Sequence, residues 1–415
     1  MASETRLQNR RAIEALRSGV PNRDAVRSLG AAQDVIEEHF LAQLDAVRAG
    51  GYPRGTVLSG DFGSGKSHLL EYVRHLALDQ RFVASKVVIS KETPLHDPAK
   101  VFRAAIADAS LPDRRGAALP EIAEHLSFES ESYRELKCWA ASDESELDAR
   151  FPATLHLYEH LRAGDPDFAQ RVVRFWAGDP LGVGELNRGL RDVGAAGEYA
   201  IGALPARELA VQRFRFAARM MQAVGYGGWV LLFDEIELIG RYSLLQRARS
   251  YPEIWRWTAG LREERLSGIG AVMAVTSDFH RAVIRDKNDE ELVPAKLRAR
   301  DDQLLALRAE LAMREIEVES LQIRHPDAAV RDEIYRRLRE IHGAAYDWEP
   351  PEIPHGAGVR STREYVRAWI YEWDLRRLDP SYVPHIEFDV GVSSNYEEDA
   401  ELETPMEGAE LEDVL

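Results

Sequence analysis

The eight residues from Gly60 to Ser67 restrict the folds open to this 415-residue chain more than any other segment. They match the pattern G-x-x-x-x-G-K-[ST] completely. A β-prone run, Thr56–Ser59, precedes them, and a helical apolar pattern, Leu69–Leu78, follows. A strand, a glycine-rich turn and a helix in this order are typical of a phosphate-binding loop, because the glycines let consecutive backbone N–H groups point at one anion.

We predict that this loop holds the triphosphate of ATP. The Lys66 ammonium reaches the β- and γ-phosphates, and the Ser67 hydroxyl is a ligand of Mg²⁺. The helix that follows adds the positive end of its dipole. The predicted nucleotide-binding residues are Gly60, Asp61, Phe62, Gly63, Ser64, Gly65, Lys66, Ser67 and His68.

A pair of acids follows a second β-prone run. Trp229–Phe233 is a continuous apolar stretch, which is typical of a buried parallel strand, and Asp234 and Glu235 come directly after it. A carboxylate at the end of such a strand is placed to hold Mg²⁺ through water, and a second one to deprotonate an attacking water. We therefore predict that Asp234 is a metal ligand and that Glu235 is the catalytic base of ATP hydrolysis.

Strands and helices alternate along the core, which predicts an α/β fold with a parallel sheet. Further strands are expected at Val83–Ser90, Ala271–Val275 and Ile316–Ile323. Residues 110–205 are expected to form a helical insertion, and two helical patterns, Asp327–Ile341 and Ser361–Leu378, a small C-terminal lid. This arrangement predicts an AAA+-like P-loop NTPase. Its parts are N-terminal helices (1–50), an ATPase core (51–323), a helical lid (324–384) and an acidic, disordered tail (385–415).

Two polar positions are candidates for contacts with the γ-phosphate. Thr276 follows the apolar strand Ala271–Val275, and it faces the γ-phosphate if that strand lies between the other two site strands. Arg360 opens the last lid helix and can bring a cation to the same phosphate, although Arg363 and Arg367 are alternatives. We predict catalytic roles for Thr276 and Arg360 beside Glu235 and Lys66. A polar strand end and solvated arginines are the structural alternatives.

Other basic residues are harder to place. An arginine that acts on a neighbouring subunit is expected among Arg281, Arg285, Arg298 and Arg300, without a choice between them. One helix carries Arg207, Arg213, Arg215 and Arg219, for which we favour a solvated face over a nucleic-acid stripe. Near the N-terminus, the backbone of Val20–Arg23 is a candidate contact for adenine.

The overall charge argues against a global footprint for nucleic acid. Lys and Arg total 53 and Asp and Glu 70, a net charge of −17. Residues 397–413 contain nine acids and no base, so a local basic groove on the body stays possible. The single cysteine, Cys138, is expected to be buried and inert, in a reducing cytosol. No apolar run approaches the ~20 residues of a membrane helix, and the N-terminus has no signal-peptide core, so a cytoplasmic location is expected.

Three segments together resemble one family. They are Ala15–Asn22 with Ser28–Gly30, the loop Gly60–Ser67, and Gly225–Glu237, which contains Asp-Glu-x-Glu after a glycine-rich lead-in. They resemble the BrxD family, the ATP-binding proteins of BREX (bacteriophage exclusion) defence systems, over about residues 7–380. The resemblance implies an ATPase that acts with DNA-directed partners such as a helicase-like protein. Glu237 matches the second acid of the family.

The sequence thus favours a Mg²⁺-dependent ATPase in a phage-defence assembly, with nucleotide-dependent homo-oligomers. Whether it binds DNA directly stays open. The main alternative is a STAND/ORC-like switch that recruits partners in its ATP-bound state with little turnover. A metabolic kinase is a weaker alternative, because the chain has no dedicated acceptor-site motif.

Overall fold

A computed structural model describes residues 2–18, 22–112, 117–202, 204–258, 260, 266–324, 326–353, 362–384 and 395–402. Within these residues, five strands form one parallel sheet in the order β2-β3-β4-β1-β5. The strands are β1 (Thr56–Gly60), β2 (Val83–Val88), β3 (Trp229–Asp234), β4 (Ile269–Thr276) and β5 (Leu321–Gln322). The sheet confirms the predicted α/β class.

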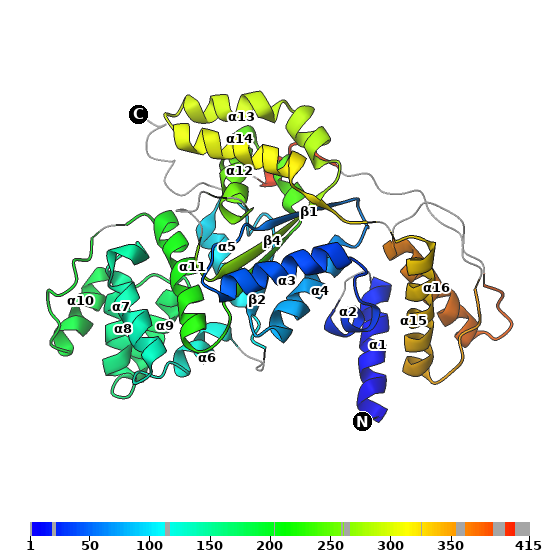
Figure 1. Ribbon diagram of the computed structural model, residues 1–415, viewed down its shortest axis with the longest axis horizontal. Helices are drawn as coiled ribbons and strands as arrows, with labels where there is room; N and C mark the ends of the chain where they lie inside the picture. The colour runs from blue at the N-terminus through cyan, green and yellow to red at the C-terminus, as the bar shows by residue number, and fades with distance from the viewer. Residues whose placement is uncertain are drawn as a thin grey trace.

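Helices cover both faces of the sheet, and Figure 1 shows α3 and α4 in front of it. These two helices, α3 (Asp34–Arg48) and α4 (Lys66–Asp79), bury Phe40 and Leu70 against Leu58 and Val230. The opposite face packs on α5 (Pro98–Asp108), α11 (Ala206–Ala223) and α12 (Leu244–Thr258). Because both faces are covered, β3 and β4 are apolar and buried along most of their length.

The segment between β2 and β3 is largely helical and gathers at one end of the sheet (Figure 1). Its aromatic side chains fill a core that is continuous with the α11 face, where the Trp176 ring lies 5.5 Å from that of Phe216. The helices between α5 and α11 are α6 (Ala118–Glu124), α7 (Glu131–Ala140), η1 (Asp143–Ser145), α8 (Arg150–Leu161), α9 (Pro166–Trp176) and α10 (Val183–Asp192).

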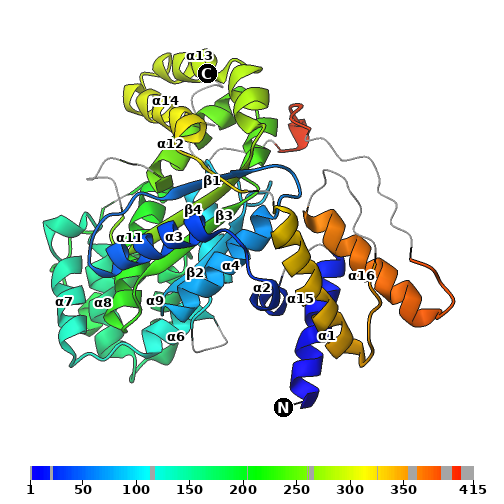
Figure 2. The same ribbon diagram turned by 45° about the vertical axis from the view of Figure 1, so that its right-hand side comes forward.

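The N-terminal helices divide between two cores. Helix α3 joins the sheet, whereas α1 (Ala2–Ser18) and α2 (Arg23–Leu29) share a third apolar core with α15 (Ala328–Tyr346) and α16 (Thr362–Leu378). An ion pair between Arg17 and Asp374, 2.5 Å apart, ties α1 to α16. Figure 2 shows these four helices standing beside the sheet as one group. The helices of residues 1–50, expected to form one N-terminal unit, are thus divided between the sheet and this third core.

The remaining elements follow β3 and β4 and lie over the upper side of the sheet in Figure 1. They are η2 (Ile236–Arg241), the π-helical turn η4 (His280–Arg285), α13 (Asp289–Arg298), α14 (Gln303–Val318) and the tail segment η5 (Ala400–Leu402). No helix among the described residues is both long and apolar enough to cross a membrane.

Three sequence expectations need correction. Cys138 is exposed, because it lies two residues from the buried Leu136 and therefore on the other side of α7. The stretch Ile316–Ile323 is mostly not a strand: α14 continues to Val318 and leaves only Leu321–Gln322 to pair with β1. Residues 395–402 of the tail are ordered, because their acidic and aromatic side chains find partners on the core.

Candidate functional site

The carboxyl ends of β1, β4 and β3 meet at one edge of the sheet. Gly60 pairs with Thr276 in the β1–β4 ladder, and Phe233, just before Asp234, pairs with Met273 in the β3–β4 ladder. Strand β4 therefore lies between β1 and β3, which meets the condition set for Thr276 in the sequence analysis. This edge brings the glycine-rich loop, the acidic pair and Thr276 together, which is where parallel α/β sheets bind ligands.

The loop from Gly60 to Ser67 connects β1 directly to the first turn of α4. Gly63 and Gly65 have φ values of 77° and 103°, which only glycine adopts without strain. Ser64 donates its N–H to the Asp61 carbonyl at 3.0 Å, which closes the turn. The free N–H groups at the start of α4 and the positive end of its dipole make this turn a cradle for phosphate.

Lys66 lies inside this cradle, with 8% of its surface exposed. Its Nζ lies 3.2 Å from the Gly60 carbonyl oxygen and 3.4 Å from that of Asp61. A carboxylate oxygen of Glu237 lies 3.6 Å from the same nitrogen. The ammonium is thus held over the loop by oxygen atoms, where a phosphate oxygen can replace them.

Asp234 is buried at the end of β3 and pairs with a lysine that the sequence analysis did not single out. Lys86 Nζ lies 2.8 Å from Asp234 Oδ2, and the Glu235 N–H donates to Asp234 Oδ1 at 3.1 Å. Lys86 belongs to β2, which runs parallel to β3 so that Val88 stands opposite Asp234. The available signal was a lone lysine inside the apolar run of β2, but only the strand order shows which acid it meets.

The two glutamates that follow differ in their surroundings. Glu235 has a left-handed backbone (φ 61°, ψ 32°), a strained conformation for a non-glycine residue that is common at functional sites. Desolvation and the charge of Asp234 raise the pKa of Glu235. Burial raises the pKa of Glu237 to about 7, against the opposing effect of Lys66. Glu237 Oε2 is buried and has no hydrogen-bond partner among the described residues.

Thr276 is buried at the end of β4, and its hydroxyl meets a residue from the distant tail. Thr276 Oγ1 lies 2.5 Å from the Tyr396 hydroxyl, which also lies 2.9 Å from Asp278 Oδ1. The next residue, Ser277, hydrogen-bonds through its hydroxyl to the Asp61 side chain in the loop. Sequence reasoning missed Tyr396, because the acidic composition around it indicated disorder.

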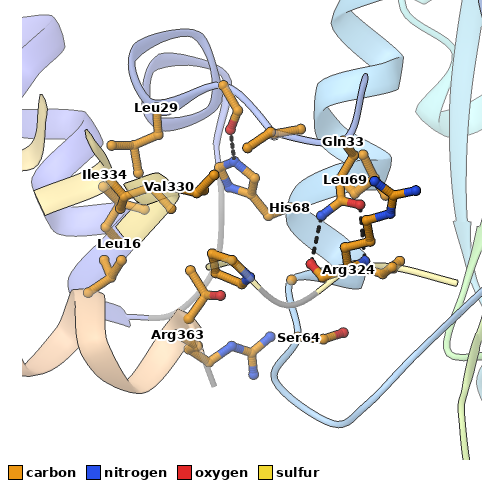
Figure 3. A pocket seen from close by; sticks show the side chains of 18 residues that line it. Leu16, Leu29, Gln33, Ser64, His68, Leu69, Arg324, Val330, Ile334 and Arg363 are labelled. Atoms are coloured by element: carbon orange, nitrogen blue, oxygen red, sulfur yellow. Dashed lines mark hydrogen bonds between the residues drawn. The ribbon is translucent and has the colours of Figure 1, made fainter. Parts of the chain in front are cut away.

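A pocket opens beside the loop, between the sheet and the group of helices that contains the lid (Figure 3). Its walls are mostly apolar and come from α1, the end of α2, the loop before α3, the start of α4, α15 and α16. They include Leu16, Leu29, Gly30, Leu69, Val330, Ile334 and Val366. Gln33 and Arg324 close one side through two reciprocal hydrogen bonds of 2.8 and 3.1 Å. An apolar slot next to a phosphate cradle suits a nucleobase and its sugar.

His68 fixes the position of the segment after α2. Its Nε2 lies 2.8 Å from the Gly30 carbonyl oxygen (Figure 3), so the ring donates a proton there. Burial lowers the pKa of His68, which keeps the ring neutral and its single N–H on Nε2. Val20 and Pro21, expected near adenine, lie outside the described residues, and the Asn22 side chain caps α2 by accepting from the Ala25 N–H.

The three candidate arginines of the lid differ in their positions relative to the loop. Arg360 lies outside the described residues. Arg363, its sequence alternative, lines the pocket near the loop residue Ser64 (Figure 3), and its charge acts on Glu235. Arg367 is exposed on the outer side of α16.

The arginines of α11 bind the rest of the chain instead of forming a solvated face. Arg213 is buried and donates to the Phe175 and Asp179 carbonyls, and Arg207 pairs with Glu253 at 2.5 Å. Arg215 pairs with Glu146, and Arg219 lies over the Trp139 ring. The helical segment uses these cations internally, so they do not make a stripe for nucleic acid.

Among the candidates for a subunit-to-subunit contact, Arg285 and Arg298 make surface ion pairs, and Arg281 and Arg300 are exposed.

The donor set at this edge fits a nucleoside triphosphate with a hard cation. The cradle and Lys66 suit phosphate oxygens, and the Ser67 hydroxyl and the Asp234 carboxylate are oxygen ligands of the kind Mg²⁺ prefers. The unpaired Glu237 Oε2 is a further acceptor within the site.

A family model described as BREX system ATP-binding protein BrxC/D matches residues 5–191 and 201–356. The matched ranges include the loop, the acidic pair, Thr276 and most of the described pocket. No curated protein and no solved structure matches the chain.

Proposed function

The chain belongs to the BREX system ATP-binding proteins of the BrxC/D family, and from this premise we propose a Mg²⁺-dependent ATPase of the AAA+ class that works in the phage-exclusion assembly. Within the family, we propose the BrxD type. The observation that carries the proposal is the meeting of Lys66, Asp234 and Glu235 at one sheet edge beside an apolar pocket.

Each residue of the site has a distinct proposed task. The loop N–H groups and Lys66 bind the triphosphate, and Ser67 and Asp234 hold Mg²⁺, which neutralises phosphate charge when bound. Glu235 accepts the proton of the attacking water. Thr276 donates a hydrogen bond from its hydroxyl to the γ-phosphate. Arg363 brings a cation from the lid, in place of Arg360 or together with it.

Glu237 is the second candidate for the catalytic base. Its pKa of about 7 is suited to proton transfer near neutral pH, and its free Oε2 can accept a hydrogen bond from water. Its contact with Lys66 places it beside the cradle. We favour Glu235, because it directly follows the proposed metal ligand on a rigid strand.

Family membership also supports partners from the same defence system. We propose a DNA-directed, helicase-like partner and homo-oligomers whose assembly depends on nucleotide. The lid and the core both line the nucleotide pocket, so a bound nucleotide can couple their positions to neighbouring subunits.

The test combines turnover and mass. ATP hydrolysis is measured with Mg²⁺ or with chelator, with and without single- and double-stranded DNA, beside the molecular mass with and without nucleotide. Lys66→Ala removes the main side-chain cation of the cradle, and Lys296→Ala, an exposed lysine on α13, is the matched control.

We expect Mg²⁺-dependent hydrolysis that Lys66→Ala abolishes and Lys296→Ala leaves intact. A slow rate that DNA does not change, with an ATP-dependent change in mass, favours the STAND/ORC-like switch instead. Equal ATP affinity of Lys66→Ala and wild type in calorimetry contradicts the assignment of the loop.

A further inference from the structure

The tail segment 395–402 lies against the edge of the sheet that carries the nucleotide site. Figure 2 draws its short helix η5 in red, on the side of the sheet where α12–α14 lie. Tyr396 and Leu402 pack on the main core, and the Asp399 N–H donates to the Arg241 carbonyl at 3.0 Å. The segment is therefore seated by apolar, ionic and backbone contacts together.

Charge holds the segment in place. Asp399 pairs at 2.5 Å with Arg241, the last residue of η2, and Glu398 pairs with Arg247 at 2.7 Å. Arg247 is itself buried and lies 3.0 Å from Asp289. The acidic residues that indicated disorder thus find basic partners beside the site.

The Tyr396 ring occupies a space that the core leaves open for it. Its centroid lies 6.2 Å from that of Phe279 in an edge-to-face arrangement. A Cβ added to Gly240 would lie 2.8 Å from the Tyr396 ring and 2.6 Å from the Val283 side chain. Glycine at position 240 therefore lets the ring pass close to the backbone of η2.

The hydrogen bonds of Tyr396 determine which hydroxyl group is the donor between Tyr396 and Thr276. The Tyr396 hydroxyl donates its hydrogen to Asp278 Oδ1 at 2.9 Å. The Tyr396 oxygen then accepts the hydrogen of Thr276, 2.5 Å away. A threonine hydroxyl has one proton, so Thr276 has none left to donate to a phosphate oxygen.

We propose that Tyr396 is a positioning residue of the ATP site, which holds the hydroxyl proton of Thr276 away from the γ-phosphate while the tail is docked. ATP and the tail then compete for Thr276, and release of residues 395–402 completes the site. This inference rests on the proposed function, because it takes Thr276 as the residue that faces the γ-phosphate.

The test compares two nucleotides that differ at the γ-position. Calorimetry measures the affinities of Mg-ADP and of the non-hydrolysable analogue Mg-adenylyl imidodiphosphate for wild type and Tyr396→Phe. The matched control is Tyr371→Phe, an exposed tyrosine on α16. Tyr396→Phe keeps the ring and its packing but frees the Thr276 proton.

We expect the triphosphate analogue to bind about two- to tenfold more tightly to Tyr396→Phe, the worth of one hydrogen bond, with unchanged ADP affinity. In a Thr276→Val background, which has no proton to release, Tyr396→Phe should have no effect on either affinity. A structural role of Tyr396 would shift both nucleotides and survive in that background.

Unchanged or weaker analogue binding in Tyr396→Phe overturns the inference, and so does an equal gain for ADP. If wild type binds neither nucleotide, the proposed function fails and the inference fails with it. These outcomes differ, because the inference alone fails only when wild-type binding is intact.

Discussion

Lys86 on β2 and Asp234 on β3 form an ion pair of 2.8 Å inside the candidate ATP site, with side-chain exposures of 18% and 5%. The pair joins two neighbouring strands through their side chains, at the carboxyl edge where Mg²⁺ is proposed to bind. A resident cation thereby compensates the buried carboxylate of Asp234, which is otherwise costly to keep ionised.

Removal of Lys86 should make the protein depend on Mg²⁺ for stability. Lys86→Met leaves Asp234 buried without its partner, so we expect the free energy of unfolding in chelator to fall by about 3 kcal/mol or more. Mg²⁺ with ATP should restore more stability to the variant than to wild type. Urea titration measures both effects, with the exposed Lys91→Met as control. Equal stability of the two variants would contradict the role of the ion pair.

Glu235→Gln should separate nucleotide binding from turnover. The amide keeps the shape of the side chain but cannot accept a proton, so ATP affinity should persist while hydrolysis falls by about 10²–10⁴-fold. Asp234→Asn should weaken Mg²⁺-dependent binding as well. The single-turnover rate of hydrolysis and the calorimetric affinity for ATP are measured for both variants and compared. Unchanged hydrolysis in Glu235→Gln would transfer the role of base to Glu237.

Glu237 should make the protein less stable as the pH rises. Its pKa is about 7 in the folded chain and about 4.3 when unfolded. Between these values the folded state binds more protons, so the contribution to stability is complete below about pH 4.3 and is lost as the pH rises through about 7. The loss amounts to about 4 kcal/mol at most.

Urea titrations across this range should therefore show a smaller decline in Glu237→Gln than in wild type. The exposed Glu208→Gln on α11 serves as control, and its decline should follow wild type. Parallel curves for wild type and Glu237→Gln would show that Glu237 titrates normally.

Arg363 should distinguish ATP from ADP. It lines the pocket from α16 and acts electrostatically on Glu235, so its cation lies on the phosphate side of the site. We expect Arg363→Ala to weaken ATP binding about tenfold or more, with a smaller effect on ADP. Arg367→Ala, which removes an exposed arginine of the same helix, should change neither affinity. Equal losses for both nucleotides would place Arg363 against the base or sugar instead.

Sequence patterns identified the features whose residues lie close together in the chain. The loop Gly60–Ser67 and the run before Asp234 each lie within about ten residues, and apolar periodicity predicted α4, α15 and α16. The position of β4 between β1 and β3 was only a condition in the sequence analysis, and the strand order of the sheet supplies it.

The missed features all depend on partners that are distant in sequence. Lys86 meets Asp234 only because β2 lies next to β3, and Tyr396 meets Thr276 from the far end of the chain. Composition describes residues 395–402 as an acidic tail, but it contains no information about Arg241 and Arg247. The ending of α14 was misjudged because alternation between Ile316 and Ile323 also fits one side of a helix.

The strand order also determines when each strand can pair with its neighbour during protein synthesis. Strand β2 leaves the ribosome well before β3, because all the helices from α5 to α11 lie between them. An even longer stretch of chain separates β1 from its neighbour β4. At about 5–20 residues per second, the first strands spend seconds without their neighbours and are exposed to aggregation during that time. The helices in between pack on one another, α8 on α9 and α5 on α11, and the whole segment precedes β3 in the chain. If they fold first, they shorten the loop that β3 must close, so the segment between β2 and β3 also guides the assembly of the sheet.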